Sequence, residues 1–282
     1  MVAFLYNTPL AMGLFQTAFS KKNRALLSEL VKTDFKLRYQ GSMVGYLWSL
    51  LRPLFMFMIL YVVFTTVFPL GKGIPHYPVY LFTGMVIWNF FTEMTQQGLG
   101  SIVARGDLIR KIKIPRWMIV FSTSIGALIN LGLNLIVLGV FMAADNIVPM
   151  SSIVWVPLIL LEVYMFGLGV SYFLAAAFVK FRDLQFIWEL FVQAGFYLTP
   201  ILYPLTQIKN ELYQKLIFMN PLAQAIQDAR YSIVSHHEST ITIHRVFEGG
   251  WYSLIPIGIS IAVFVLGLLY FRAKAPEFAE NL

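Results

Sequence analysis

The segment VGYLWSLLRPLFMFMILYVVFTTVFP, residues 44–69, decides the class of fold because it is long, apolar and almost free of charge. A membrane-spanning helix needs about 20 mostly apolar residues in a row. Arg52 is the one charged residue in this segment, and it lies near the beginning, where an arginine can meet anionic lipid. The segment therefore predicts a helix that crosses a lipid bilayer.

The composition of the whole chain supports the same class. Of its 282 residues, 58% are hydrophobic and 12% are charged, whereas soluble domains are about 45–50% apolar and about 25% charged. The net charge of +7 is typical of basic cytoplasmic loops, so we expect no nucleic-acid partner. The absence of cysteine excludes disulfides, thiolate catalysis and cysteine-ligated metals. The N-terminal Lys and Arg follow the apolar stretch, so we expect no cleavable signal peptide.

Six long apolar stretches, including residues 44–69, predict an all-α integral membrane protein with a single transmembrane domain over residues 1–282. Lys and Arg concentrate in the N-terminal tail, in alternate loops and in the C-terminal tail. This bias places both termini of a multi-pass membrane protein in the cytoplasm. The predicted spans are 44–69, 78–103, 117–143, 152–179, 185–203 and 251–271.

Two further segments are predicted to be helical without crossing the membrane. Residues 24–39 place apolar side chains on one half of a helix and charged ones on the other, which indicates an interfacial helix in contact with membrane lipids. Residues 204–235 are semi-polar and follow Pro200 and Pro204, which end the fifth span early. We expect two short helices in 204–235 that dip back or cap the outer face; a simple extracellular loop is the alternative.

Short basic stretches carry the candidate interaction sites. Residues 104–116 combine basic side chains with an apolar periodicity at Leu108, Ile109 and Ile112, which indicates docking onto a partner. Asp34 and Arg38 are four residues apart on the interfacial helix and can pair. Arg38 and Arg52 could contact anionic lipid or a pyrophosphate, and the sequence alone favours lipid anchoring. Tyr39, Tyr46 and Trp48 are of the type that lies at the headgroup level.

Other chemistry is sparse. The chain has no phosphate-binding loop, so we expect it to bind no nucleotide in that way. His236, His237 and His244 lack the helical spacing of a metal site, and no metal is expected. Glu162 lies in the middle of the fourth span, where it either bonds to a neighbouring helix or couples transport to protons.

Four motifs in order carry a resemblance to a known family. They are LVKTDFKLRYQGSMVGYLWSLLRPL, LIRKIKIPRW, FRDLQFIWELFVQAGFYLTPILYP and NPLAQAIQDAR. Together they resemble the permease subunits of type-2 ABC exporters, in the branch that exports O-antigen, capsular polysaccharide and teichoic acid. The resemblance runs over nearly the whole chain.

The resemblance implies a homodimer of six-span subunits that works with two copies of a separate cytoplasmic ATPase. It implies that 24–39 and 104–116 dock the ATPase, that 40–47 forms a gate helix, and that 204–235 caps the outer exit. The candidate docking residues are Asp34, Arg105, Asp107, Leu108, Ile109, Arg110, Lys111, Ile112 and Lys113. The first and fifth spans would line the conduit. The candidate gate and substrate residues are Arg38, Tyr39, Tyr46, Trp48, Arg52, Phe55, Tyr61, Trp188, Phe191, Phe196 and Tyr197.

The expected function is export of a polyprenyl-pyrophosphate-linked cell-envelope polymer, with wall teichoic acid favoured over O-antigen or capsular polysaccharide. The chain itself is expected to catalyse nothing and to bind no cofactor, because ATP and Mg²⁺ belong to the partner ATPase. Exporters of small molecules or lipids, a proton-coupled secondary transporter and a membrane-embedded enzyme acting on polyprenyl lipids are the alternatives.

Overall fold

The computed structural model describes residues 21–39, 45–68, 71, 73–111, 114–148, 150–234, 240–247 and 249–281. All regular elements in these ranges are helices, and no strand occurs in them, so the all-α prediction is confirmed. The chain divides into two compact units, Met1–Gly45 and Tyr46–Leu282. The described part of the first unit is dominated by α3 (Lys21–Tyr39), which contains the segment predicted as an interfacial helix.

Six helices of the second unit correspond to the predicted spans. They are α4 (Trp48–Val62), α5 (Tyr77–Ala104), α7 (Trp117–Ala144), α8 (Val156–Lys180), α9 (Leu184–Leu198) and α13 (Ile255–Lys274). Among the described residues, four helical stretches are long and apolar enough to cross a bilayer: Trp48–Val67, Trp117–Ala144, Ser151–Lys180 and Trp251–Asn281. They contain α4, α7, α8 and α13 with the turns that flank them. The chain is thus an integral membrane protein, and the count of six spans stays a prediction.

The two other helices miss this standard for different reasons. Helix α9 has 15 residues and spans about 22 Å, which is less than the hydrocarbon core of about 30 Å. Helix α5 has 28 residues, about 42 Å, and is long enough but less apolar. Its acidic side chain has partners in the protein. Glu93 accepts hydrogen bonds from Gln97 Nε2 (2.7 Å) and from Asn130 Nδ2 of α7.

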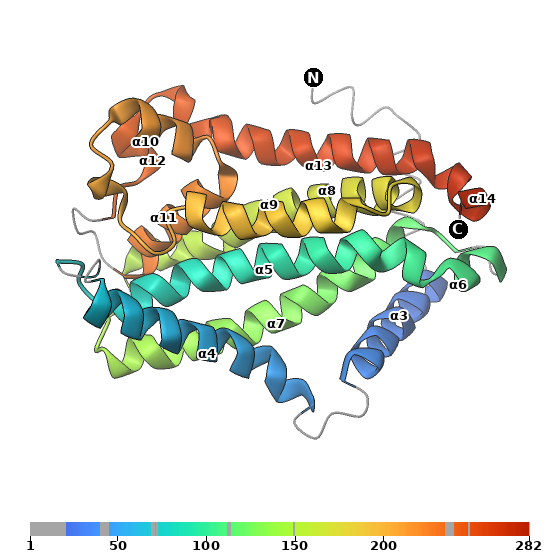
Figure 1. Cartoon of the computed structure of the whole chain (residues 1–282), viewed down its shortest axis with the longest axis horizontal. Helices are drawn as coiled ribbons and strands as arrows, with labels where there is room; N and C mark the ends of the chain where they lie inside the picture. The colour runs from blue at the N-terminus through green and yellow to red at the C-terminus, as the bar shows by residue number, and fades with distance from the viewer. Residues whose placement is uncertain are drawn as a thin grey trace. The chain divides into compact units, whose positions relative to one another are not determined.

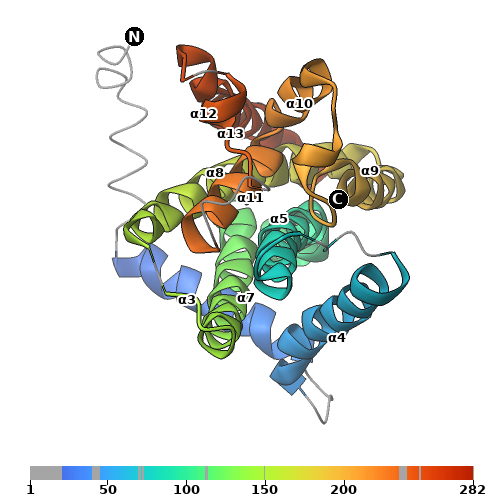
Figure 2. The same ribbon diagram turned by 90° about the vertical axis from the view of Figure 1, so that its left-hand side faces the viewer.

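The position of α5 explains this composition. Figure 2 looks along the helices and shows α5 between α4, α7, α8 and α9, all of which contact it. Most of its side chains are buried, so it needs less apolar surface than a helix that faces lipid.

Helices α8 and α13 approach each other closely through glycine. A Cβ added to Gly267 of α13 would lie 2.1 Å from the carbonyl oxygen of Gly169 in α8. A side chain at either position would therefore push the helices apart. Small residues at such a contact let backbones pack directly, which stabilises helix pairs inside a membrane.

Short helices gather at the two ends of the long ones (Figure 1). At one end lie α10 (Glu211–Phe218), α11 (Pro221–Ile233) and α12 (Ile243–Val246), and at the other lie α6 (Gly106–Lys111) and α14 (Phe278–Asn281). The remaining helical turns are Gly45–Leu47, Val63–Val67, Ser151–Trp155, Leu205–Gln207, Trp251–Leu254 and Ala275–Glu277. The α6 end also carries Lys180 and Arg272, so basic segments far apart in the sequence meet there.

Candidate conduit and coupling surfaces

Helix α4 presents three of its predicted conduit residues on an open surface. The side chains of Trp48 and Phe55 are 49% and 51% exposed, and Arg52 is also exposed. Tyr61 instead turns toward the protein, where its ring stacks on that of Tyr77 in α5 with centroids 6.4 Å apart. The first three side chains are thus available to lipid, substrate or a second copy, whereas Tyr61 attaches α4 to α5.

The aromatic residues of α9 divide into two groups. Trp188 Nε1 donates a hydrogen bond to Thr95 Oγ1 of α5 (3.2 Å). Phe196 packs edge-on against Trp88 of α5, with ring centroids 6.1 Å apart. Phe191 and Tyr197 are 66% and 61% exposed. Of the four predicted conduit residues on this helix, two therefore hold α9 in place and two face outward.

The exposed face of α9 also carries a polar flank that the sequence analysis missed. Gln185, Glu189 and Gln193 follow one another at intervals of four and are all exposed, and Tyr197 continues the series. Gln185 Nε2 donates to Glu189 Oε1 (3.1 Å). Residues four apart lie on one side of a helix, so this spacing was the signal that could have revealed the flank. Ala194 lies on the opposite flank.

Polar groups exposed on a membrane helix need water or protein as a neighbour. Lipid offers no hydrogen-bond partner, and each unsatisfied polar group costs several kcal/mol there. The polar flank of α9 therefore suits a water-filled path or another protein surface rather than acyl chains. Gln, Glu and Tyr side chains also provide the donors and acceptors that hydroxyl-rich molecules bind.

Helix α6 differs in one respect from the predicted docking segment. Ile109, expected on an outward apolar stripe, is 8% exposed and packs into the main hydrophobic core. Asp107, Arg110 and Lys111 are exposed instead, and Leu108 is half-buried. A six-residue helix has room for one apolar face, and the protein core occupies it. The surface that this helix presents is therefore charged.

For the other predicted site residues, the structure gives only their exposure or does not describe their side chains. Arg105 is half-buried next to α6, and Asp34 is half-buried on α3. His244 is exposed in α12, and the described residues contain no group of three side chains suited to a metal ion. Of the predicted gate helix 40–47, the described part is a 3-10 turn over Gly45–Leu47. The side chains of Arg38, Tyr39 and Tyr46, and all of Ile112, Lys113, His236 and His237, lie outside the described residues.

Arg230 of α11 is a second feature that sequence reasoning missed. Its side chain is completely buried. It donates from Nε to the Tyr80 carbonyl (3.0 Å), from Nη1 to the Pro200 carbonyl (2.6 Å) and from Nη2 to the Ile201 carbonyl (2.6 Å). Its guanidinium also lies 3.6 Å from the centroid of the Tyr80 ring. Arg230 thus ties α11 to α5 and to the chain that leaves α9.

The carboxyl group of Glu162 lies among polar side chains of other helices. Ser260 Oγ of α13 donates to Glu162 Oε1 (3.4 Å), and the carboxyl group of Asp228 in α11 is close enough to repel it. Burial raises the pKa of Asp228, while a hydrogen bond from Gln224 Nε2 (2.6 Å) opposes this. Of these contacts, the hydrogen bond from Ser260 gives Glu162 a partner on a neighbouring helix, as one of its two predicted roles requires.

Comparisons with known proteins agree with the motifs. Residues 25–234, which include all four motifs, match the family described as ABC-2 type transporter. The chain is 30% identical over 260 residues to the O-antigen export system permease protein RfbA of Myxococcus xanthus, covering 92% of this chain and 96% of the relative. It is 36% identical over 258 residues to an RfbA of Klebsiella pneumoniae, covering 91% and 95%. The polysialic acid transport protein KpsM of Escherichia coli is 20% identical over 218 residues, covering 75% and 82%.

Proposed function

Because the chain belongs to the ABC-2 type transporter family, we propose that it is the membrane subunit of an ATP-driven exporter that moves a lipid-linked polysaccharide across the cytoplasmic membrane. The names of its relatives, which refer to O-antigen and polysialic acid, support a polysaccharide over a small molecule. Wall teichoic acid, which the sequence analysis favoured, stays a prediction without such support. We place O-antigen ahead of it.

The observation that carries this proposal is the polar flank of α9. A glycan presents many hydroxyl groups and needs a path lined by hydrogen-bonding side chains. Gln185, Glu189 and Gln193 form such a lining on a predicted span and are open to solvent in the single subunit. Exposed Tyr197, four residues after Gln193, adds an aromatic face on which sugar rings can stack.

The proposed assembly contains two copies of this chain and two copies of an ATPase. In this assembly all six predicted spans cross the membrane, the fifth being α9 together with the chain up to residue 203, and both termini lie in the cytoplasm. The meeting of basic segments at the α6 end supports this orientation. ATP and Mg²⁺ bind to the ATPase, and this chain contributes movement rather than catalysis.

Coupling is proposed to run through α6. Its exposed charges, Asp107, Arg110 and Lys111, form the surface that the ATPase contacts, and Ile109 passes displacement of α6 to the core. When the ATPases close on ATP, the long helices shift and open the path along α9 and α4.

Arg52 is the proposed contact for the pyrophosphate of the lipid carrier. It is exposed on α4 close to the aromatic surface of Trp48 and Phe55, and a guanidinium fork matches pyrophosphate oxygens. Arg52→Ala should raise the concentration of polyprenyl pyrophosphate that stimulates the ATPase by about ten-fold, the size of one charge-assisted hydrogen bond. An unchanged response would remove Arg52 from the site.

Cysteine labelling tests the path directly, because the chain contains no native cysteine. Gln193→Cys and Ala194→Cys place a thiol on the two flanks of α9 at nearly the same depth. In the assembled transporter, a water-soluble maleimide should modify the cysteine at 193 and leave the cysteine at 194 largely unmodified. Modification at 193 should also block ATP-dependent export of the polysaccharide from inverted vesicles.

Two results would contradict the proposal. Equal labelling at both positions would mean that the polar flank lines no separate path. Export that proceeds without the ATPase subunit and ATP would exclude an ATP-driven mechanism altogether.

A further inference from the structure

A cavity of about 460 Å³ lies at the α6 end of the second unit. It opens between the start of α7 and the end of α13. Its walls are formed by Ile109, Ile114, Arg116, Trp117, Phe271, Arg272 and Ala275. Two arginines and two aromatic rings thus line a single hollow on a membrane protein.

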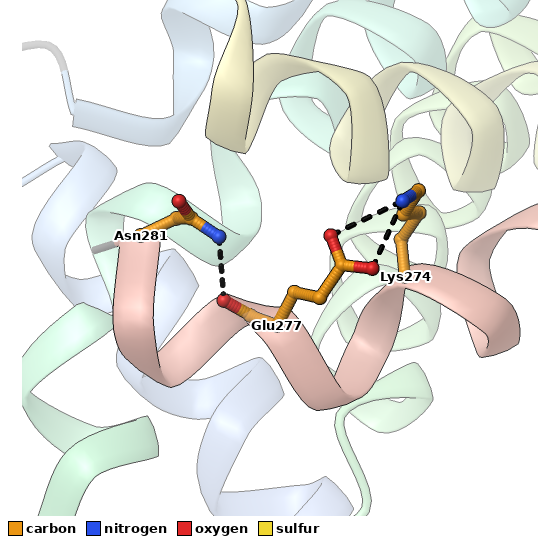
Figure 3. Close-up of polar contacts among 3 residues, drawn as sticks. All are labelled: Lys274, Glu277 and Asn281. Atoms are coloured by element: carbon orange, nitrogen blue, oxygen red, sulfur yellow. Dashed lines mark hydrogen bonds and ion pairs between the residues drawn. The ribbon is translucent and has the colours of Figure 1, made fainter.

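The cations of this cavity lack a described counter-ion. Arg116 Nη1 donates to the carbonyl oxygen of Ala275, which fixes the guanidinium at the wall. Arg272 is half-buried, and neither arginine forms a salt bridge with an acid in the described part of the chain. Lys274, two residues after Arg272, is different, because Glu277 accepts from its Nζ at 2.9 and 3.1 Å (Figure 3). The uncompensated positive charge therefore belongs to the cavity.

The apolar part of the cavity is rigid. The ring of Phe271 is held on one side by Tyr172, with centroids 5.2 Å apart, and on another by Phe278 at 5.3 Å. Trp117 begins α7 and is half-buried, as is typical of tryptophan at the level of lipid headgroups. A ligand that fills this cavity must be anionic at one part and apolar at another.

We propose that this cavity binds an anionic phospholipid, with its phosphate between Arg116 and Arg272 and an acyl chain against Trp117 and Phe271. Arginine forks match phosphate oxygens, and basic pockets between membrane helices are suited to anionic headgroups. A soluble anion would gain nothing from the two aromatic rings. The lipid would join the start of α7 to the end of α13.

The cavity is distinct from the proposed ATPase contact. Ile109 lines the cavity, whereas Arg110 and Lys111 are exposed on other sides of α6. The lipid would therefore support the coupling helix from within the membrane, and it is separate from the exported cargo.

Tryptophan quenching tests the proposal on the full chain in nanodiscs of phosphatidylcholine. Phosphatidylglycerol with brominated acyl chains is added in increasing fraction, and brominated phosphatidylcholine serves as the neutral comparison. The chain has six tryptophans, so the share of Trp117 is the difference between the wild type and Trp117→Phe. We expect that share to be quenched by the phosphatidylglycerol at a fraction well below that needed with phosphatidylcholine.

Two matched variants distinguish lipid binding in the cavity from a general effect of the protein's positive charge. Arg272→Gln should raise the half-quenching fraction of phosphatidylglycerol by about ten-fold, because it removes a charge-assisted contact. Lys274→Gln removes the same charge from a surface ion pair and should change it by less than about two-fold. Native mass spectrometry of wild type and Arg272→Gln, which leaves Trp117 intact, should show loss of bound phosphatidylglycerol.

Three outcomes would overturn the proposal. Equal quenching by the two lipids would show that the cavity does not select charge. Equal effects of Arg272→Gln and Lys274→Gln would assign the selectivity to the surface. Loss of quenching when the ATPase subunit is added would show that a protein side chain occupies the cavity in the transporter.

Discussion

Replacing Arg230 should destabilise the chain more than any replacement of a surface cation. Its guanidinium is fully buried and bonds the carbonyl groups of Tyr80, Pro200 and Ile201. Two of these carbonyls follow the end of α9 at Leu198, where the backbone lacks helical partners. Arg230→Met has a similar length and no donor, so it would remove the donors of the Pro200 and Ile201 carbonyls, whereas the Tyr80 carbonyl keeps its place in the helical ladder of α5.

The magnitude follows from these contacts. A hydrogen bond to a charged group contributes about 1.5–3 kcal/mol. Two such bonds amount to about 3–6 kcal/mol; the full sum is not lost, because the variant no longer buries a charge, so we expect a loss of about 3–4 kcal/mol. At about 2–4 °C per kcal/mol for a domain somewhat smaller than this chain, we expect the melting temperature to fall by about 10 °C.

The assay is thermal unfolding of the purified chain in detergent, followed by tryptophan fluorescence. Arg245→Met is the matched control, since Arg245 is exposed on α12, and it should melt with the wild type. Arg230→Lys keeps the charge without the fork and should lie between the two. If Arg230→Met melts within about 2 °C of the control, less than 1 kcal/mol is lost and the proposed tie between α11, α5 and the end of α9 is wrong.

Three further results are expected. Reversing the charges of Arg110 and Lys111 to glutamate should abolish ATP hydrolysis coupled to export while the chain remains in the membrane fraction; unchanged ATPase activity would remove α6 from the coupling surface. Glu162→Gln should leave ATP-driven export unchanged, because Gln keeps an oxygen for the hydroxyl of α13; export lost together with sensitivity to a proton gradient would favour a secondary transporter. Gly267→Ala should lower the free energy of unfolding by about 1–3 kcal/mol relative to Gly258→Ala, because a Cβ at 267 overlaps α8 and one at 258 meets open space; equal stability of the two variants in detergent would show that the helix contact is loose.

Much of the fold is predictable from composition, because a helix that crosses lipid needs about 20 mostly apolar residues in a row. The span predicted at 117–143 appears as Trp117–Ala144, and the one at 251–271 begins at Trp251. The proline rule also held at α9, which ends at Leu198 just before Pro200. Span prediction is less secure for α5, because its apolar character depends on neighbours that a single sequence does not identify.

The site was less predictable because the direction of a side chain depends on packing. Trp188 and Phe191 are equally aromatic, yet the first bonds to α5 and the second is exposed. Ile109 fits an outward docking stripe by spacing and is instead taken up by the core. Arg230 lies in an ordinary-looking polar helix, and nothing near it in sequence indicates that its partners are carbonyls of Tyr80 and Ile201.

Polar residues on the predicted spans differ in whether they find hydrogen-bond partners within the chain. In α5, Glu93 accepts hydrogen bonds from Gln97 and from Asn130 of α7, so its carboxyl group has partners within the single chain. In α9, Gln193 and Glu189 face outward, where lipid would leave them unsatisfied. On the proposed six-span fold, Gln193 therefore needs water or hydrogen-bonding groups beside it, which a second copy enclosing a glycan path would supply.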